Sequence, residues 1–232
     1  MTAGGAEVLV FTRTAGYRHE SIEAGVIALT ELADAAGVAM RATEDPAELC
    51  PPVLQRCAVV VFLNTSGTVL GRDQRAALAS FVRGGGGFAG VHCAAATEPD
   101  WPYYGNMLGA RFARHPAVQP GVIRLVDRDH PATAHLPDPW PRTDEWYDFD
   151  HPPAGVRVLL RIDEASYTGG GMGAEHPLAW CHEFGGGRVF YTALGHTVES
   201  YAEPELRQHL WGGVVWAGAG RRSRPLREAG HA

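Results

Sequence analysis

Residues 84–96 read GGGGFAGVHCAAA, and this stretch decides the fold of the chain. Glycines that follow a helix-like segment lead into a short apolar run, which stops at His92 and Cys93. This pattern is typical of a buried parallel strand with polar residues at its end. In open α/β sheets, ligands bind at the carboxyl ends of the strands, because strand tips, loops and helix N-termini meet there. The sequence therefore predicts a candidate site at the end of this strand.

Strands and helices alternate around this segment. Short apolar runs predict strands at 7–12, 38–43, 57–63 and 88–92. Helical spacing of apolar residues predicts helices from residue 22 to Gly37, over 72–83 and over 203–216. Such alternation indicates an α/β fold with a doubly wound, mainly parallel sheet.

The second half of the chain is less regular. Residues 98–150 are rich in Pro, Trp, Tyr and His and carry one expected strand at 122–126, so we predict an irregular functional insertion. A further strand is expected at 156–162. Apolar runs at 178–184 and 188–193, joined by glycines, predict a C-terminal hairpin. We expect one domain over residues 1–217 and a disordered tail over 218–232.

Composition excludes several classes of protein. The chain has 232 residues, 45% of them hydrophobic, which suits one sizeable domain. A net charge of -6 argues against a nucleic-acid partner, and no apolar run suggests a leader or a membrane span, so we expect a cytoplasmic protein without a membrane partner. The 4 cysteines include no Cys-x-x-Cys pair, which favours reduced thiols over a disulfide framework or a cysteine zinc site.

Two polar groups lie where other strands are expected to end. Arg18 and His19 stand at the start of the first helix, where helix-terminal N–H groups could hold an anion or a polar oxygen. The alternative is that these residues only satisfy the first turn of the helix. His196 follows the last expected strand, and Glu199 could orient it as an acid or base or could be an ordinary helix-start charge.

The end of the strand at 88–92 offers two candidate residues. A tight turn from strand to helix needs small residues two places before and two places after the exposed one. For His92 these are Gly90 and Ala94, whereas Cys93 has the bulkier Val91 before it. The spacing favours His92 as the site residue. Cys93 is then a small buried thiol, although a nucleophilic role for it stays open.

Acidic and aromatic residues are adjacent at 143–147, which read TDEWY. Aromatic rings can stack on the apolar face of a sugar while carboxylates bond its hydroxyls. Glu145 and Tyr147 are therefore candidates for a sugar site, although acids beside aromatics are also common on ordinary surfaces.

Four ordered motifs of the chain resemble those of the ThuA-like (trehalose utilisation) family over roughly residues 7–217. They are GYRHESI at 16–22, GGGFAGVH at 85–92, DEWY at 144–147 and GRVFYTALGHT at 187–197. The resemblance implies a flavodoxin-like sheet of the class I glutamine amidotransferase-like superfamily. In true amidotransferases a cysteine occupies the elbow, where this chain has His92. A histidine is a poor substitute for a thiolate in acyl transfer, which argues against glutamine amidotransferase activity.

The resemblance implies an enzyme of trehalose-type disaccharide or keto-sugar metabolism, and we expect a hydrolase, lyase or isomerase that uses acid–base chemistry. We assign catalysis to His92, Glu145 and His196, and binding of the sugar-like substrate to Arg18, His19 and Tyr147. The same residues could hold a divalent metal, although no ligand spacing in the sequence requires one. A non-catalytic sugar-binding or regulatory module, and a cysteine hydrolase built on Cys93, His196 and Glu199, are the alternatives. A homo-oligomer is compatible with the sequence.

Overall fold

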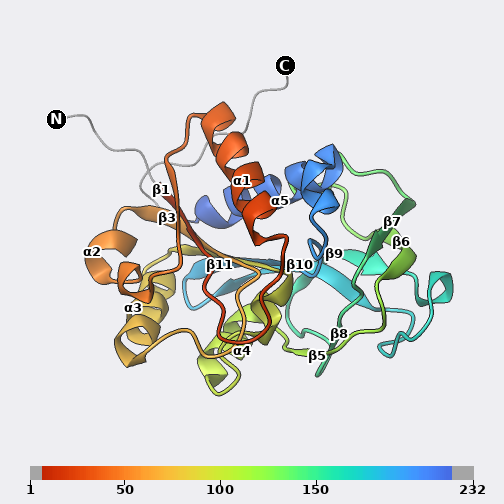
Figure 1. The fold of residues 1–232 in the computed structure, drawn as a ribbon, viewed down its shortest axis with the longest axis horizontal. Helices are drawn as coiled ribbons and strands as arrows, with labels where there is room; N and C mark the ends of the chain where they lie inside the picture. Colours follow the sequence, from red (N-terminus) through yellow and green to blue (C-terminus); the bar gives the residue numbers. More distant parts are fainter. Residues whose placement is uncertain (1–6, 221–232) are drawn as a thin grey trace.

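The computed structural model describes residues 7–220, and most of them belong to one mixed sheet and the helices that cover it (Figure 1). The strands are β1 (Glu7–Phe11), β2 (Met40–Thr43), β3 (Cys57–Leu63), β4 (Gly87–Val91), β5 (Phe112–Arg114), β6 (Gln119–Leu125), β7 (Trp140–Asp144), β8 (Asp148–Phe149), β9 (Arg157–Ile162), β10 (Pro177–Phe184) and β11 (Gly187–Thr192). The α-helices are α1 (Ile22–Ala36), α2 (Pro51–Leu54), α3 (Arg72–Arg83), α4 (Pro102–Leu108) and α5 (Pro204–Gly218).

Within residues 7–220, the main sheet has nine strands in the order β2-β1-β3-β4-β11-β10-β9-β6-β7. The strands from β2 to β11 pair in parallel, and those from β11 to β7 pair antiparallel. The α/β class and the doubly wound parallel part of the sheet are confirmed. The predicted hairpin is confirmed as β10 and β11, whose turn places Gly185 and Gly186 at φ 61° and 107°, a conformation that favours glycine.

Helices cover both faces of the parallel part of the sheet. Helices α1 and α5 lie together on one side, and α3 and α4 lie on the other (Figure 1). Every residue of β3 is buried, as expected for a strand covered on both faces. In β4, a Cβ on Gly87 would collide with the backbone of Ala217 in α5, and one on Gly90 would lie 2.8 Å from Leu108 in α4. The glycines of β4 therefore let helices approach the sheet closely from opposite sides.

The middle of the chain is more ordered than the sequence predicts. Residues 98–150 contain α4, β5, β7 and β8 besides β6, which includes most of the strand expected at 122–126. Strand β7 alternates buried and exposed residues, but two of its buried residues are Arg142 and Asp144. Hydrophobic periodicity cannot reveal a strand whose inner face is partly charged, and so this extension of the sheet was missed.

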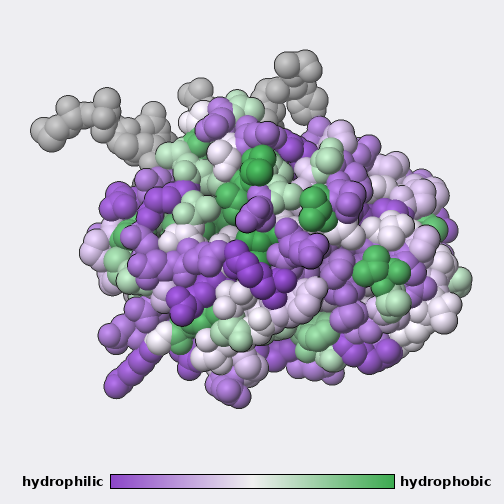
Figure 2. Space-filling model, viewed as in Figure 1, coloured by the Kyte–Doolittle hydropathy of each residue, from purple (hydrophilic) through white to green (hydrophobic). Residues whose placement is uncertain are grey.

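The end of the chain also differs from the expectation. Helix α5 ends at Gly218 rather than at 216. Residues 221–232 of the expected tail lie outside the described residues. None of the described helices is long and apolar enough to cross a membrane. The face seen in Figure 2 is mostly hydrophilic, with apolar residues in small separate groups.

The buried His209 of α5 makes stability depend on pH. Its Nδ1 lies 2.7 Å from the carbonyl oxygen of Ala132 and its Nε2 lies 3.0 Å from the hydroxyl of Thr192. Burial lowers the pKa of His209 from 6.5 to about 3. Below pH 6.5 the unfolded chain therefore binds a proton at His209, whereas the folded chain binds it only near pH 3. The stability that neutral His209 contributes is lost as the pH falls from 6.5 toward 3.

We expect the free energy of unfolding to fall by about 2 kcal/mol between pH 7 and pH 5 from His209 alone. Urea titrations at both pH values should show that His209→Gln loses less stability than the wild type between pH 7 and pH 5, by this same amount. The glutamine amide can bond the same two partners. Gln208→Ala, at the neighbouring exposed position, is the control, because it neither adds nor removes a titratable group. An unchanged pH dependence in His209→Gln would contradict the assignment.

Candidate active site

His92 occupies the turn between β4 and the short 3-10 helix at His92–Ala96. Its φ is 49°, in the left-handed region that few residues other than glycine and asparagine adopt. A Cβ on Gly90 would lie 3.3 Å from the Cβ of Ala94, so the turn does require small residues at these positions. The strained residue of the elbow is thus His92 and not Cys93, as the spacing predicts.

The His92 ring is fully buried and has one defined tautomer when neutral. Its Nδ1 lies 2.6 Å from the carbonyl oxygen of Ala193, and a carbonyl oxygen can only accept, so Nδ1 carries the proton and donates. The lone pair is then on Nε2. This atom lies 3.1 Å from His19 Nε2 and 3.3 Å from His196 Nδ1.

Glu145 completes the cluster from the other side. Its Oε2 lies 3.3 Å from both His92 Nε2 and His196 Nδ1, and its Oε1 lies 3.0 Å from His115 Nδ1. Burial acts to raise the pKa of Glu145, but the neighbouring imidazoles of His196 and His92 outweigh it and hold that pKa well below its usual range. Conversely, the hydrogen bond to Glu145 raises the pKa of His196. Glu145 is therefore a carboxylate at neutral pH.

His19 differs electrostatically from His196. Burial, together with the neighbouring His92 and His196, lowers the pKa of His19 to about 3. The cluster thus pairs a neutral imidazole on one side of His92 with a more basic one on the other.

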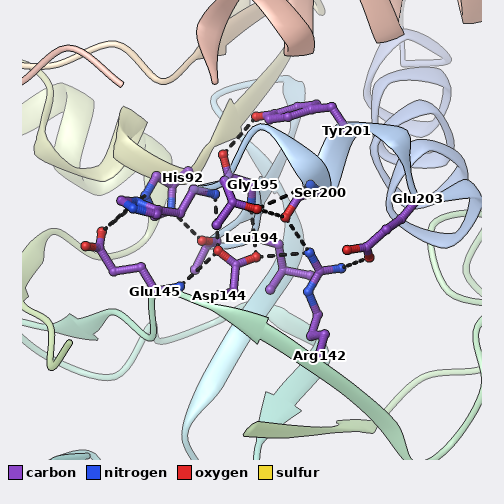
Figure 3. A network of polar contacts seen from close by, with 12 residues as sticks. His92, Arg142, Asp144, Glu145, Leu194, Gly195, Ser200, Tyr201 and Glu203 are labelled. Atoms are coloured by element: carbon purple, nitrogen blue, oxygen red, sulfur yellow. Dashed lines mark hydrogen bonds and ion pairs between the residues drawn. The ribbon is translucent and has the colours of Figure 1, made fainter. Parts of the chain in front are cut away.

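A buried ion pair holds Glu145 and His196 in place (Figure 3). The Asp144 carboxylate is fully buried and accepts the backbone N–H groups of Glu145 at 2.9 Å, His196 at 3.1 Å and Gly195 at 3.2 Å. The guanidinium of Arg142 lies 3.2 Å from Asp144. One carboxylate therefore fixes the end of β7 against the loop after β11, and with it the distance between two members of the cluster.

A cleft of about 540 Å³ opens beside the cluster and has the size of a small-molecule site. The Tyr147 ring lies against His92 with centroids 4.3 Å apart and also forms part of the cleft wall. Besides His19, Glu145 and His196, the lining includes Gly16, Tyr17, Ser66, Phe112, His115 and Tyr147. Aromatic faces next to titratable and hydroxyl groups suit a sugar ring.

The structure brings together most of the residues that the sequence singled out. One ligand atom from each of His19, His92, Glu145 and His196 lies within 4.8 Å of the others, and Tyr147 adjoins them. This donor set could hold a metal ion.

Two expected participants lie elsewhere. Arg18 donates to Glu44 at 2.7 Å, its side chain is 46% exposed, and it is not among the described residues that line the cleft. Adjacent residues point in different directions here, so that Tyr17 and His19 line the cleft and Arg18 does not. Glu199 is exposed, and the carboxylate that His196 contacts is that of Glu145. The arrangement expected for a hydrolase with Cys93, His196 and Glu199 is therefore not formed.

Several residues of the site were missed in the sequence, including Tyr17 and Ser66 in the cleft wall. His115 and Phe112 come from β5 and the loop after it, and Asp144 lies at the end of β7. Asp144 had a usable signal, since it directly precedes Glu145. For His115 and Phe112 the sequence offers no such signal, because their position depends on how residues 98–150 fold back over the sheet.

Comparison with known proteins identifies the family. The family model described as ThuA, trehalose utilisation, matches residues 7–217. The chain belongs to the ThuA family. The match contains every member of the cluster, and the family description supports a role in sugar metabolism for this ThuA protein.

Solved structures agree with the ThuA fold. A ThuA-like protein from Bacteroides uniformis superposes with a TM-score of 0.81 at 22% identity, over 97% of this chain and 96% of the other. A ThuA-like protein from Parabacteroides merdae gives 0.76 at 18% identity, over 95% and 92%. A β-galactosidase from Rahnella gives 0.59 at 15% identity, over 91% of this chain but 31% of its own. No curated protein matches the sequence. At these identities the likeness shows the fold alone, so the chemistry of this ThuA protein must be argued from its own residues.

Proposed function

We propose that this chain is an enzyme that acts on a trehalose-type disaccharide or a keto-sugar derived from one. His92, Glu145 and His196 move protons, and His19 and Tyr147 contact the substrate. The observation that carries the proposal is the convergence of four titratable groups within 4.8 Å beside an aromatic cleft of about 540 Å³. The ThuA description, trehalose utilisation, supports the substrate class.

The cluster offers a proton donor and a proton acceptor side by side. His196 is the donor, because the Glu145 carboxylate raises its pKa. His92 Nε2 is the acceptor, because the carbonyl oxygen of Ala193 keeps the proton of the neutral ring on Nδ1. His92 Nε2 and His196 Nδ1 lie 3.3 Å apart. With a keto-sugar, such a pair can remove the acidic proton next to the carbonyl and return it to another atom. Isomerisation and elimination both begin with that step.

Incubation of the protein with trehalose and with keto-disaccharides in D2O tests this proposal. With the keto-disaccharides we expect NMR to show deuterium entering the carbon next to the carbonyl, with conversion of the sugar, at a rate proportional to enzyme concentration. Trehalose has no carbonyl group, so it can be converted but not exchanged by this step. Ligand binding without exchange or conversion would favour the non-catalytic module. Neither binding nor exchange with any of these sugars would overturn the proposed substrate class.

The thiol of Cys93 is expected to be dispensable. Burial raises the pKa of Cys93 to about 11, so little thiolate is present at neutral pH. We expect Cys93→Ser to change kcat on the sugar identified above by less than about threefold, within the range of small packing effects. A loss of the size that follows removal of a catalytic nucleophile, about 10⁴-fold or more, would restore the cysteine hydrolase.

A further inference from the structure

We propose that His19, His92, His196 and Glu145 together bind one divalent transition-metal ion of the zinc type. The ligand atoms are the Nε2 atoms of His19 and His92, Nδ1 of His196 and Oε2 of Glu145. The assignment concerns the same site as the proposed function, and the part that the ion plays in turnover rests on that function. Metal binding itself rests on the geometry alone.

Four of the six distances between ligand atoms in the cluster are close to those of a tetrahedral site. Zinc lies about 2.0–2.2 Å from nitrogen and oxygen ligands, so the ligands of a tetrahedral site lie about 3.3–3.6 Å from one another. His92 Nε2 lies 3.1 Å from His19 Nε2, 3.3 Å from His196 Nδ1 and 3.3 Å from Glu145 Oε2. The Glu145 to His196 distance is also 3.3 Å. These separations leave room for one small cation among the four atoms.

The lone pair of His92 Nε2 is aimed at this point, with the nitrogens of His19 and His196 within hydrogen-bond distance of it. The carbonyl oxygen of Ala193 takes the Nδ1 proton of His92, which is the outer contact that orients most metal-binding histidines. In the neutral ring Nε2 then carries a lone pair and faces the Glu145 carboxylate at 3.3 Å (Figure 3). Two acceptors cannot hydrogen-bond each other, whereas a cation between them stabilises both.

The donor set selects the class of ion. Three imidazoles and one carboxylate suit zinc, iron, nickel or copper, whereas magnesium and calcium prefer oxygen ligands. An ion at this position borders the cleft, because His19, Glu145 and His196 also line it. When bound, it would polarise a carbonyl or hydroxyl oxygen of the substrate as a Lewis acid, in place of proton transfer by His92 and His196, whose lone pairs it would occupy.

A second cluster, Asp148, Glu164 and His176, is not among the described residues that line the cleft. His176 Nδ1 lies 2.8 Å from Glu164, and its Nε2 donates to the carbonyl oxygen of Tyr147 at 2.8 Å. The carboxylate of Asp148 pairs with Arg114. This group offers one imidazole where the cluster around His92 offers three, and Arg114 neutralises one of its carboxylates, so it suits a transition-metal ion less well.

Metal titration of the full-length chain tests the assignment without any substrate. After dialysis against a chelator, we expect calorimetry with Zn²⁺ to give one tight site per chain. Addition of Co²⁺ should give the visible absorption bands of tetrahedral cobalt. His196→Asn and Glu145→Gln, which remove one ligand each, should weaken Zn²⁺ binding by at least about 100-fold, more than the loss of an outer contact. The exposed His151 gives the control, and His151→Asn should bind Zn²⁺ like the wild type.

The result that would overturn the metal site is equally direct. It is overturned if the folded wild type, checked by circular dichroism, binds Zn²⁺ no more tightly than Glu145→Gln. Activity separates this result from the proposed function. Tight Zn²⁺ binding without any sugar turnover would support the metal site and reject the proposed function, whereas full turnover by protein that cannot bind Zn²⁺ would do the reverse.

Discussion

Replacing Arg142 with methionine is expected to lower the free energy of unfolding by about 3–5 kcal/mol, the usual cost of removing one partner of a buried ion pair. The Arg142 side chain is 2% exposed and contacts Asp144, Ser200 and Glu203. Without the guanidinium, the fully buried Asp144 carboxylate loses its counter-ion. Much of the expected loss comes from this uncompensated charge rather than from the lost contacts.

Two further variants separate charge from packing. Arg142→Met combined with Asp144→Asn leaves no fully buried unpaired charge, so we expect the double variant to recover part of the lost stability. Arg18→Met removes the partner of Glu44 from an exposed pair and should cost less than about 1 kcal/mol. Urea unfolding of all these variants at pH 7 gives the comparison. Equal losses in the free energy of unfolding for Arg18→Met and Arg142→Met would show that the buried ion pair stabilises the protein no more than the exposed one.

The sequence reveals the part of the fold and site that follows local rules. Buried parallel strands appear as apolar runs, and their ends mark where site residues gather. His19, His92 and His196 all follow such strands, and they meet because the carboxyl ends of β1, β4 and β11 share one edge of the sheet. The small residues at Gly90 and Ala94 also identify His92 as the strained residue, since that restriction is local.

The remainder depends on tertiary packing that no local pattern encodes. Strand β7 lacks the hydrophobic alternation that would identify it, because Arg142 and Asp144 are on its buried face. Their burial depends on the ion pair between them. His115 reaches Glu145 only after the β5 segment has folded over the cleft. Arg18 fails as a site residue for a related reason, because the direction of a side chain at a helix start depends on its neighbours in space, here Glu44.

Turnover of the sugar is expected to fall by about 10²–10⁴-fold when His92 is replaced by asparagine, the range attributed to a positioned acid or base. Asparagine is the informative choice because it tolerates the left-handed backbone that His92 adopts at φ 49°. His92→Ala removes the same imidazole and leaves a cavity in the buried site without relieving the left-handed backbone, so it should be less stable than His92→Asn. Binding of the sugar, measured by calorimetry, should persist in His92→Asn, because the cleft walls at Tyr17, Phe112 and Tyr147 are untouched.

The two His92 variants distinguish chemistry from architecture. If His92 acts on protons or on a bound ion, both variants lose turnover to a similar degree while only His92→Ala loses stability. If His92 merely holds the elbow, His92→Asn should keep both its melting temperature and its kcat, and the loss should appear in His92→Ala alone. That second outcome would move the catalytic role to His196 and Glu145. The left-handed conformation places an imidazole between His19 and His196 at a structural cost, and such strain is expected to persist where the side chain that it positions is needed for function.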